Sequence, residues 1–383
     1  MSEGSEAKLP LRGGDSSLTL APARSSLAAR GRHDAAALAG QSHPEPPVPF
    51  SEIERLADQG NADAQFELGV RFEEIEVLCG DDEAYSKAAD WYRKAADQGH
   101  ANAQFRLGLL LEKGCREVPE DSAGAVRLYL KAAESFRVAA EQGDAGAQFS
   151  LGHMYDSGKG VTQDRDEAVR WYLKAAGLYR MAAERGDANA QRDLGSMYEE
   201  GHGVPQDYGE AVCWYRKAAE QGDAGAQFNL GHMYNHGKGL TKDLDAAIRW
   251  YRKSAEQGYF DAWYEIEGYV ACGNALAQAI FGSWYSEGLG LPLDYAEAVR
   301  WYRKAAEQGY AEAQSNLGEM YAEGHGVDQD YVQAHMWFNL AAAGGEAKGS
   351  QGRSMVAGKM TPQEIAQAQR LARDWRPIRG ENE

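Results

Sequence analysis

Long apolar runs and an excess of basic residues are missing from this sequence of 383 residues, and cysteines are few. No run of about 18 apolar residues occurs, so neither a transmembrane helix nor membrane insertion is expected. Four cysteines are too few to staple a chain of this length, which favours a reducing, cytoplasmic location. The 40 Lys and Arg residues are outnumbered by 58 Asp and Glu residues, and the resulting net charge of −18 argues against nucleic acid as a ligand.

The first 49 residues differ in composition from the rest of the chain. They are rich in Ala, Ser, Gly and Pro and contain five basic and five acidic residues, so the net negative charge lies entirely beyond them. No apolar run of about 7–15 residues follows a basic start, and a secretory signal is therefore not expected. We expect residues 1–49 to be a disordered tail and residues 50–383 to form one folded array.

After residue 50 the sequence repeats itself. A glutamine that follows an alanine marks each repeat, with a Leu or Phe three residues later and a Gly four residues later. Successive markers are 39, 44, 43, 36, 51 and 36 residues apart, which indicates a basic period of 36 with insertions. The markers are Gln65, Gln104, Gln148, Gln191, Gln227, Gln278 and Gln314.

Each repeat has the pattern of two amphipathic helices joined by a turn. Leu194, Met197 and Tyr198 fall on one face of a first helix, and a second block such as AVCWYRKAA has the same periodicity. Turns such as GHGVPQD lie between the two helices, and their first Gly can end the first helix in a left-handed conformation. An Asp then precedes the second helix. Where an acid or Gln follows this Asp three residues later, the pair predicts a reciprocal capping box, as at Asp164, Asp207, Asp294 and Asp330. Asp243 has no such partner and is expected to cap its helix alone.

Small and aromatic residues predict how the hairpins pack. The Gly inside each first helix costs about 1 kcal/mol relative to Ala, so we expect it to permit close helix approach. Six tryptophans share one position of the second helix and are expected to belong to the core. They are Trp91, Trp171, Trp214, Trp250, Trp301 and Trp337.

The insertions and the two ends predict departures from the regular hairpin. The second and third repeats gain seven residues in the second helix, nearly two turns, so the apolar face stays in phase. Residues 259–277 are irregular and are expected to hold an extra helix. A capping box at Ser51 predicts an N-terminal helix, and Thr361 with Pro362 and Glu364 predicts a C-terminal capping helix over 361–375.

The pattern AxAQxxLGxxYxxGxGVxxDxxxAxxWYxKAAxQG resembles the Sel1-like repeat family, a relative of the tetratricopeptide repeats. About seven repeats match over residues 60–345. The resemblance implies an all-α fold, a right-handed α-solenoid of helix–turn–helix repeats with terminal capping helices. It also implies a scaffold or adaptor function.

A face of the first helix escapes the packing pattern. Positions two, five and nine residues after the marker glutamine vary in polarity, and in the related repeats this face lines a concave groove. Side-chain amides on such a face can bond the backbone of a bound peptide, and its acids would favour a basic or neutral partner. The alternative is that these residues are only solvated. The candidate partner-binding residues are Ser150, His153, Asp193, Ser196, Asn229, His232, His236, Asn316, Glu319 and Glu323.

No motif in the sequence predicts catalysis, a metal or a cofactor. His232 and His236 are spaced to share a zinc ion, but no third ligand is evident. The only clear Ser-x-x-Lys, Ser5 to Lys8, lies in the tail. Cysteine-rich Sel1-like proteins linked to β-lactam binding carry paired cysteines in each repeat, whereas here the cysteines are isolated, although Cys79 and Cys115 lie in successive turns.

The sequence therefore predicts a non-catalytic scaffold that binds a protein or peptide partner in its concave groove. Two alternatives stay open. One is a hydrolase of the β-lactam-interacting kind, and the other is an exported effector or envelope protein.

Overall fold

The structure, a computed structural model, describes residues 50–79, 82–114, 118–289 and 291–378. These residues form 18 α-helices and no strand, an all-α solenoid of repeats. The predicted tail over residues 1–49 lies outside the described residues. The described helices fall into two compact units.

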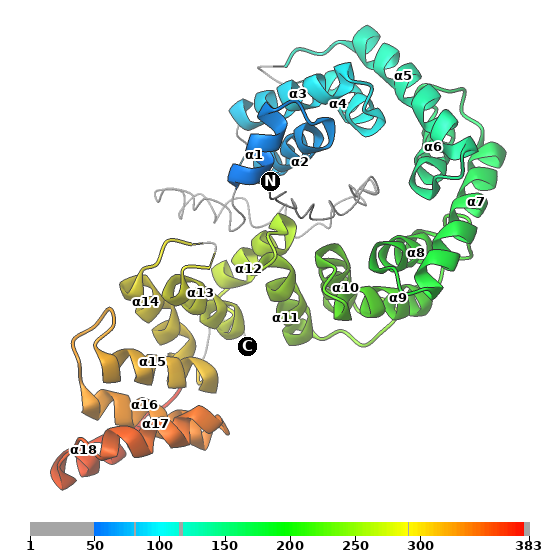
Figure 1. The fold of residues 1–383 in the computed structure, drawn as a ribbon. Coiled ribbons are helices and arrows are strands. Elements are labelled where there is room, and N and C mark those ends of the chain that lie inside the picture. Colours follow the sequence, from blue (N-terminus) through cyan, green and yellow to red (C-terminus); the bar gives the residue numbers. More distant parts are fainter. Residues whose placement is uncertain (1–49, 80–81, 115–117, 290, 379–383) are drawn as a thin grey trace, which may run out of the picture. The chain divides into compact units, whose positions relative to one another are not determined.

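Unit 1 contains the first nine helices, with residues 238–240 added (Figure 1). After α1, each first helix packs against its own second helix, which packs against the next first helix. The helices are α1 (Phe50–Asp58), α2 (Ala62–Cys79), α3 (Asp82–Asp97), α4 (Ala101–Lys113), α5 (Ser122–Glu141), α6 (Ala145–Ser157), α7 (Arg165–Glu184), α8 (Ala188–Glu200) and α9 (Tyr208–Glu220).

Unit 2 contains the remaining helices, and the boundary falls inside α10, after Ala226. Its last two helices, α17 and α18, both pack on α16 (Figure 1). The helices are α10 (Ala224–His236), α11 (Leu244–Ala255), α12 (Phe260–Ala271), α13 (Ala275–Glu287), α14 (Tyr295–Glu307), α15 (Ala311–Glu323), α16 (Tyr331–Ala343), α17 (Ala347–Ala357) and α18 (Pro362–Asp374).

The marker glutamine links successive repeats through hydrogen bonds. Gln191 is buried, and its Nε2 donates to the carbonyl oxygen of Ala183 in the preceding second helix at 3.0 Å. Its Oε1 accepts from Nε2 of Gln221 in the following second helix at 2.7 Å. The same bond to a carbonyl eight residues earlier recurs at Gln65, Gln104, Gln148 and Gln314. At Gln191 both ends of the amide are therefore satisfied in the core, whereas the amide oxygens of Gln104 and Gln148 are buried without a hydrogen-bond partner.

Glycine in the first helix makes room for an aromatic ring, as predicted. A Cβ atom on Gly195 would lie 2.7 Å from Cδ1 of Tyr215, whose side chain is fully buried. Equivalent contacts join Gly69 to Tyr92 and Gly231 to Tyr251. The aromatic residue after each shared tryptophan, a tyrosine in five repeats and Phe338 in the last, is therefore at the centre of the hairpin.

The shared tryptophans are less buried than predicted. Trp171 and Trp337 are buried, but the other four are only half-buried. A lysine three residues later covers the indole in five repeats, for example with Lys94 Nζ 3.5 Å from the Trp91 ring centre. The helical period explains this difference, because it turns the next residue, a tyrosine, toward the first helix.

The capping prediction is half correct. Asp207 Oδ1 accepts from the backbone N–H of Glu210 at 3.0 Å, and Asp164, Asp294 and Asp330 make the same bond. However, the backbone N–H of Asp207 donates to the carbonyl of Tyr198 in the first helix, at 2.8 Å. Because that N–H is already paired across the turn, the acid three residues later does not complete a reciprocal box. Asp243 caps alone, as expected.

The insertions have the predicted effect on helix length. Both α5 and α7 contain 20 residues, compared with 13 in α9 and α14. Tyr129 and Phe136, seven residues apart in α5, are both buried, so the core face stays in phase. Within the irregular segment 259–277, the extra helix is α12, which contacts α11 and α13.

Both ends differ in part from the prediction. The helix α1 begins at Phe50, so Ser51 lies in its first turn and does not precede it. At the other end, α18 has the predicted capping box between Thr361 and Glu364. The sequence pattern missed α17, whose Gly352 lies against Phe338: a Cβ there would be 2.5 Å from the ring. Phe338 therefore packs against two glycines, Gly318 of α15 and Gly352 of α17.

Candidate partner-binding surface

In unit 1 the candidate residues do not form one open face. Ser150 and His153 on α6 are half-buried, whereas Asp193 and Ser196 on α8 are buried, with Asp193 only 1% exposed. Repeats with the same sequence register therefore differ in how much of this face reaches solvent.

Asp193 belongs to a buried ion network and is not open to a partner. Nη2 of Arg192 lies 3.3 Å from Oδ1 of Asp193, and Nη1 lies 2.8 Å from Oδ2 of Asp223. All three side chains are less than 15% exposed. Removing one member would leave a buried charge without its counterion, so the network fixes the structure of α8. The expectation that Asp193 contacts a partner is corrected on this ground.

His153 lies in a cluster of titratable side chains. Burial, then the neighbouring His202, lower its pKa, so His153 is neutral at neutral pH. His202 stacks on Tyr172 with ring centres 4.4 Å apart, and its Nδ1 is 2.8 Å from Oε2 of Glu200. The sequence assigned His202 only to a turn. Its stacking shows that this turn residue packs on the preceding repeat.

An acid on the first helix pairs with the buried tyrosine of the second helix, which sequence reasoning missed. The Tyr215 hydroxyl donates to Glu199 at 3.0 Å, and Tyr92 and Tyr129 donate to the acids at the same repeat position. Burial raises the pKa of the Tyr215 phenol, so it stays a donor. The sequence does contain a signal for this pairing, because the repeat that has Phe338 in place of the tyrosine also has Ala322 in place of the acid.

Lysines from the following turn join two of these pairs. Lys159 bonds Glu112, and Lys238 Nζ lies 3.1 Å from Oε1 of Glu199. Hydrogen bonds from Lys159 and Tyr129 lower the pKa of Glu112. Part of the acidic charge on the first helices of unit 1 is therefore neutralised within the fold and is not available to a ligand.

In unit 2 the two histidines of α10 approach each other. The ring centres of His232 and His236 are 4.1 Å apart, and Nδ1 of His236 lies 3.0 Å from the carbonyl oxygen of His232. One ring nitrogen of His236 thus faces its own helix. Across the described ranges, no group of three His, Cys, Asp or Glu side chains has the geometry to hold a metal ion.

The remaining candidates of unit 2 reach solvent. Asn229 and Asn316 are half-buried, and Glu319 and Glu323 are exposed. The α15 residues between them, including Leu317, Gly318 and Met320, are buried. Glu323 lies 3.0 Å from Nδ1 of His325. This face of α15 therefore presents an amide and two carboxylates next to one another.

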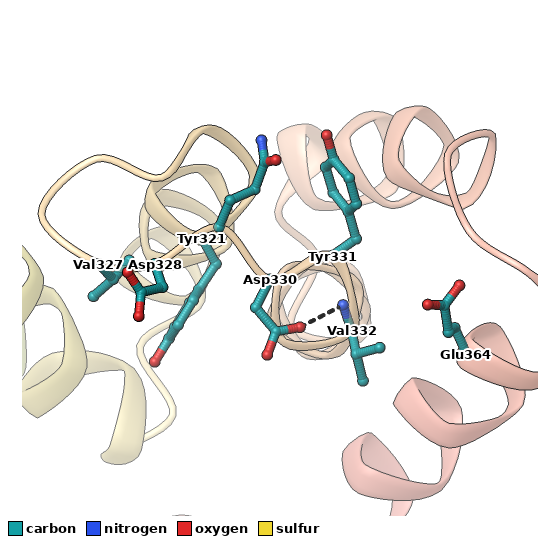
Figure 2. Close-up of a pocket in the computed structure, with 8 residues that line it drawn as sticks. Tyr321, Val327, Asp328, Asp330, Tyr331, Val332 and Glu364 are labelled. Carbon is teal, nitrogen blue, oxygen red and sulfur yellow. Dashed lines mark hydrogen bonds between the residues drawn. The ribbon is translucent and has the colours of Figure 1, made fainter.

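A hollow of about 560 Å³ lies beside the α15–α16 turn, with Glu364 of α18 at its rim. Figure 2 shows Asp330 turned back onto its own helix, where Oδ1 accepts from the N–H of Val332 at 2.8 Å. Glu364 likewise accepts from the N–H of Thr361 at 2.7 Å. Because these acids cap helices, the hollow carries no arrangement that points to catalysis.

The cysteines supply little support for β-lactam chemistry. Cys213 and Cys272 are exposed free thiols. The predicted approach of Cys79 to Cys115 lies outside the described side chains, as does the Ser5–Lys8 motif. Among the helices that the structure describes, none has the length and apolar character needed to cross a bilayer.

Comparison with known families decides what the repeats are. The family model of the Sel1 repeat matches seven segments, residues 62–100, 101–135, 145–178, 188–223, 224–259, 275–310 and 311–346. The chain belongs to the Sel1 repeat family. Each matched segment begins at a first helix, and α12 falls in the gap between the fifth and sixth Sel1 repeats.

Two solved Sel1 structures are similar to this chain. One is the c5321 protective antigen of uropathogenic Escherichia coli, at 31% identity over 86% of this chain and 94% of that chain, with a TM-score of 0.32. The other is a Sel1 repeat protein from Oxalobacter formigenes, at 31% identity over 84% and 99%, with a TM-score of 0.26. The low TM-scores mean that the assignment rests on the repeats. No curated protein matches the chain.

Sel1 repeats typically form protein-interaction scaffolds and are generally not catalytic. The physical reason is that stacked hairpins offer an extended surface, on which few side chains converge around one small volume. The described part of this chain has that organisation, with its polar side chains distributed along successive first helices.

Proposed function

We propose that the protein is a non-catalytic scaffold that binds a segment of a partner protein along the exposed face of its first helices. One observation carries the proposal: on α15, Asn316, Glu319 and Glu323 reach solvent while the packing positions around them are buried. A face that contributes nothing to the core can vary in sequence and so recognise a ligand.

The chemistry of this face indicates the kind of partner. The Asn316 amide can donate to and accept from the backbone of an extended peptide. Glu319 and Glu323 favour a basic segment, and their exposure makes the attraction sensitive to salt. In unit 2, Asn229, His232 and His236 occupy the same repeat positions on α10. Ser150 and His153 are the corresponding residues of unit 1 that solvent still reaches.

Charge reversal tests this proposal. Immobilised protein captures partners from a lysate of its own organism, and mass spectrometry compares the wild type with the variant Glu319→Lys/Glu323→Lys. We expect the variant to lose partners that the wild type elutes at raised salt. The matched control, Glu141→Lys/Glu220→Lys, makes the same charge change at two exposed acids on second helices. An identical set of partners for all three proteins would refute the proposed face.

A further inference from the structure

The two long second helices expose apolar side chains at matching positions. Each side chain is between 49% and 55% exposed. The pairs follow from the sequences AVRLYLKAAESFRVAA and AVRWYLKAAGLYRMAA. They are Val126 and Val169, Leu130 and Leu173, and Val138 and Met181.

The short second helices do not share this feature. Val212 of α9, which precedes the tryptophan as Val169 does, is only 5% exposed. The residue after the central tyrosine is Arg216 in α9 and Arg303 in α14, where α7 has Leu173. Exposed apolar residues therefore accompany the seven-residue insertion and are not a general property of the repeat.

The position of the following turn explains why Val126 and Val169 are exposed. The second glycine of that turn, Gly239 or Gly326, packs on the first residue of a short helix, Tyr208 or Tyr295. In the long helices the same glycine packs on Tyr129 or Tyr172, seven residues further along. The first two turns of α5 and α7 consequently extend past the turn that would otherwise cover them.

Gly177 marks the centre of the exposed ridge on α7. Val169, Leu173, Gly177 and Met181 follow one another at intervals of four, so they form a single ridge of the helix. A Cβ atom on Gly177 would meet no described atom within 4 Å. Glycine costs about 1 kcal/mol in an exposed helix interior, and the hairpin does not need it here. A notch in an apolar ridge permits another helix to pack closely.

Basic residues border this ridge, which limits what can occupy it. Each exposed apolar residue has Arg or Lys beside it in the sequence, although the chain as a whole carries a net charge of −18. The bordering residues are Arg127, Lys131, Arg137, Arg170, Lys174 and Arg180. Arg127, Arg137 and Arg170 pair with Asp121, Glu134 and Glu167, so the basic charge open to a ligand comes mainly from the other three. Glu134 of α5 holds the ridge position that Gly177 holds on α7. An antiparallel second copy centred on Gly177 would place Lys174 opposite Arg180 of the second copy, and like charges disfavour that pairing.

We propose that the ridge on α5 and α7 docks an amphipathic helix whose apolar stripe is bordered by acidic residues. The apolar side chains of the bound helix pack between Leu173 and Met181 over Gly177, and its acids face Lys174 of α7. This surface lies on second helices, so it is separate from the first-helix face proposed above, and the two proposals can fail independently.

The test uses a synthetic peptide with a defined pattern and the full chain. The peptide carries Leu and Ala on one helical face and Glu on both borders, with a fluorescent label, and anisotropy measures its binding. A second peptide has Lys in place of every Glu. We expect binding of the acidic peptide only, weakened about tenfold or more by Leu130→Arg/Leu173→Arg, which installs the residue that short helices carry.

Gly177→Gln separates docking from folding. Because the added side chain enters open space and glutamine is a better helix former than glycine, the variant should be at least as stable to urea as the wild type. It should nevertheless bind the acidic peptide about tenfold more weakly. The matched control, Leu293→Arg, changes an exposed leucine of unit 2 and should bind like the wild type.

Four outcomes would overturn the proposal. The acidic peptide does not bind, or the basic peptide binds equally well. Sedimentation shows a dimer that Leu173→Arg dissociates, which would identify the ridge as a contact between copies. Vesicles of phosphatidylserine and phosphatidylcholine retain the wild type but not Leu130→Arg/Leu173→Arg, which would identify a lipid surface.

Discussion

Glycines inside helices have opposite consequences at two positions of this chain. Gly195 faces the ring of Tyr215, where a Cβ would lie 2.7 Å from Cδ1, whereas a Cβ on Gly177 meets open space. Alanine gains about 1 kcal/mol of helix propensity at either position. At Gly195 we expect overpacking, about 1–3 kcal/mol, to exceed that gain and destabilise the protein. Gly177→Ala should be stabilising. Urea unfolding of both variants checks the prediction, which equal shifts in the midpoint would contradict.

Glu265 on α12 makes stability depend on pH. Burial, with a smaller effect from Asp261, raises its pKa to about 7, so the folded protein holds this carboxyl proton more tightly than the unfolded chain does. A raised pKa gives stability that is fully present below the unfolded value of about 4.5 and is lost as pH rises through about 7. Glu265→Gln should remove this loss, stabilising the protein at pH 8 by about 2 kcal/mol but not at pH 4. Urea titrations at both pH values measure it; an equal effect at both would count against the burial of this carboxyl.

The seven-residue insertion in α7 preserves the phase of the helix, so it can be removed. Deleting residues 172–178 leaves AVRWYRMAAERG, which has the pattern of a short second helix. Seven residues differ from two turns by about 20°, so Tyr179 replaces Tyr172 against Gly152. We expect a single cooperative urea transition and the circular dichroism of a helical chain.

A five-residue deletion, 173–177, is the control for that experiment. It rotates the rest of the helix by about 140° and turns Tyr179 and Ala183 away from the core. This variant should lose stability sharply, while the seven-residue deletion does not. If both deletions were tolerated equally, the phase argument for the long helices would be wrong.

At the scale of elements, the sequence predicted what local periodicity determines. The long helices α5 and α7, the extra helix α12 and the capping box of α18 all follow from patterns within one segment. It made no prediction for α17, because the segment is polar and contains two glycines, and the contact of Gly352 with Phe338 is visible only in the structure. The reciprocal caps failed for a similar reason, since the N–H of Asp207 pairs with a residue nine positions earlier.

The candidate surface was less predictable than the fold. Register alone placed Asp193 on the same face as Asn316, yet the first is buried in an ion network and the second is half-buried. The difference depends on Arg192 and Asp223, two residues that no repeat pattern relates. Exposure of Val126 and Val169 was equally hidden, because it depends on where the following turn packs. Interaction surfaces thus arise where repeats differ, and a consensus cannot reveal them.

Stability in a repeat array spreads from neighbour to neighbour, which predicts a local effect of removing α17 and α18. Without residues 347–378, Phe338 and Trp337 of α16, now buried, lose much of their cover. We expect hydrogen exchange to accelerate in α16 and α15 while the helices of unit 1 keep their protection. A chain shortened only by residues 379–383 serves as the control and should exchange like the wild type. Uniform loss of protection from α2 to α16 would mean that the chain unfolds as one cooperative body, and the nearest-neighbour description would then have to be abandoned.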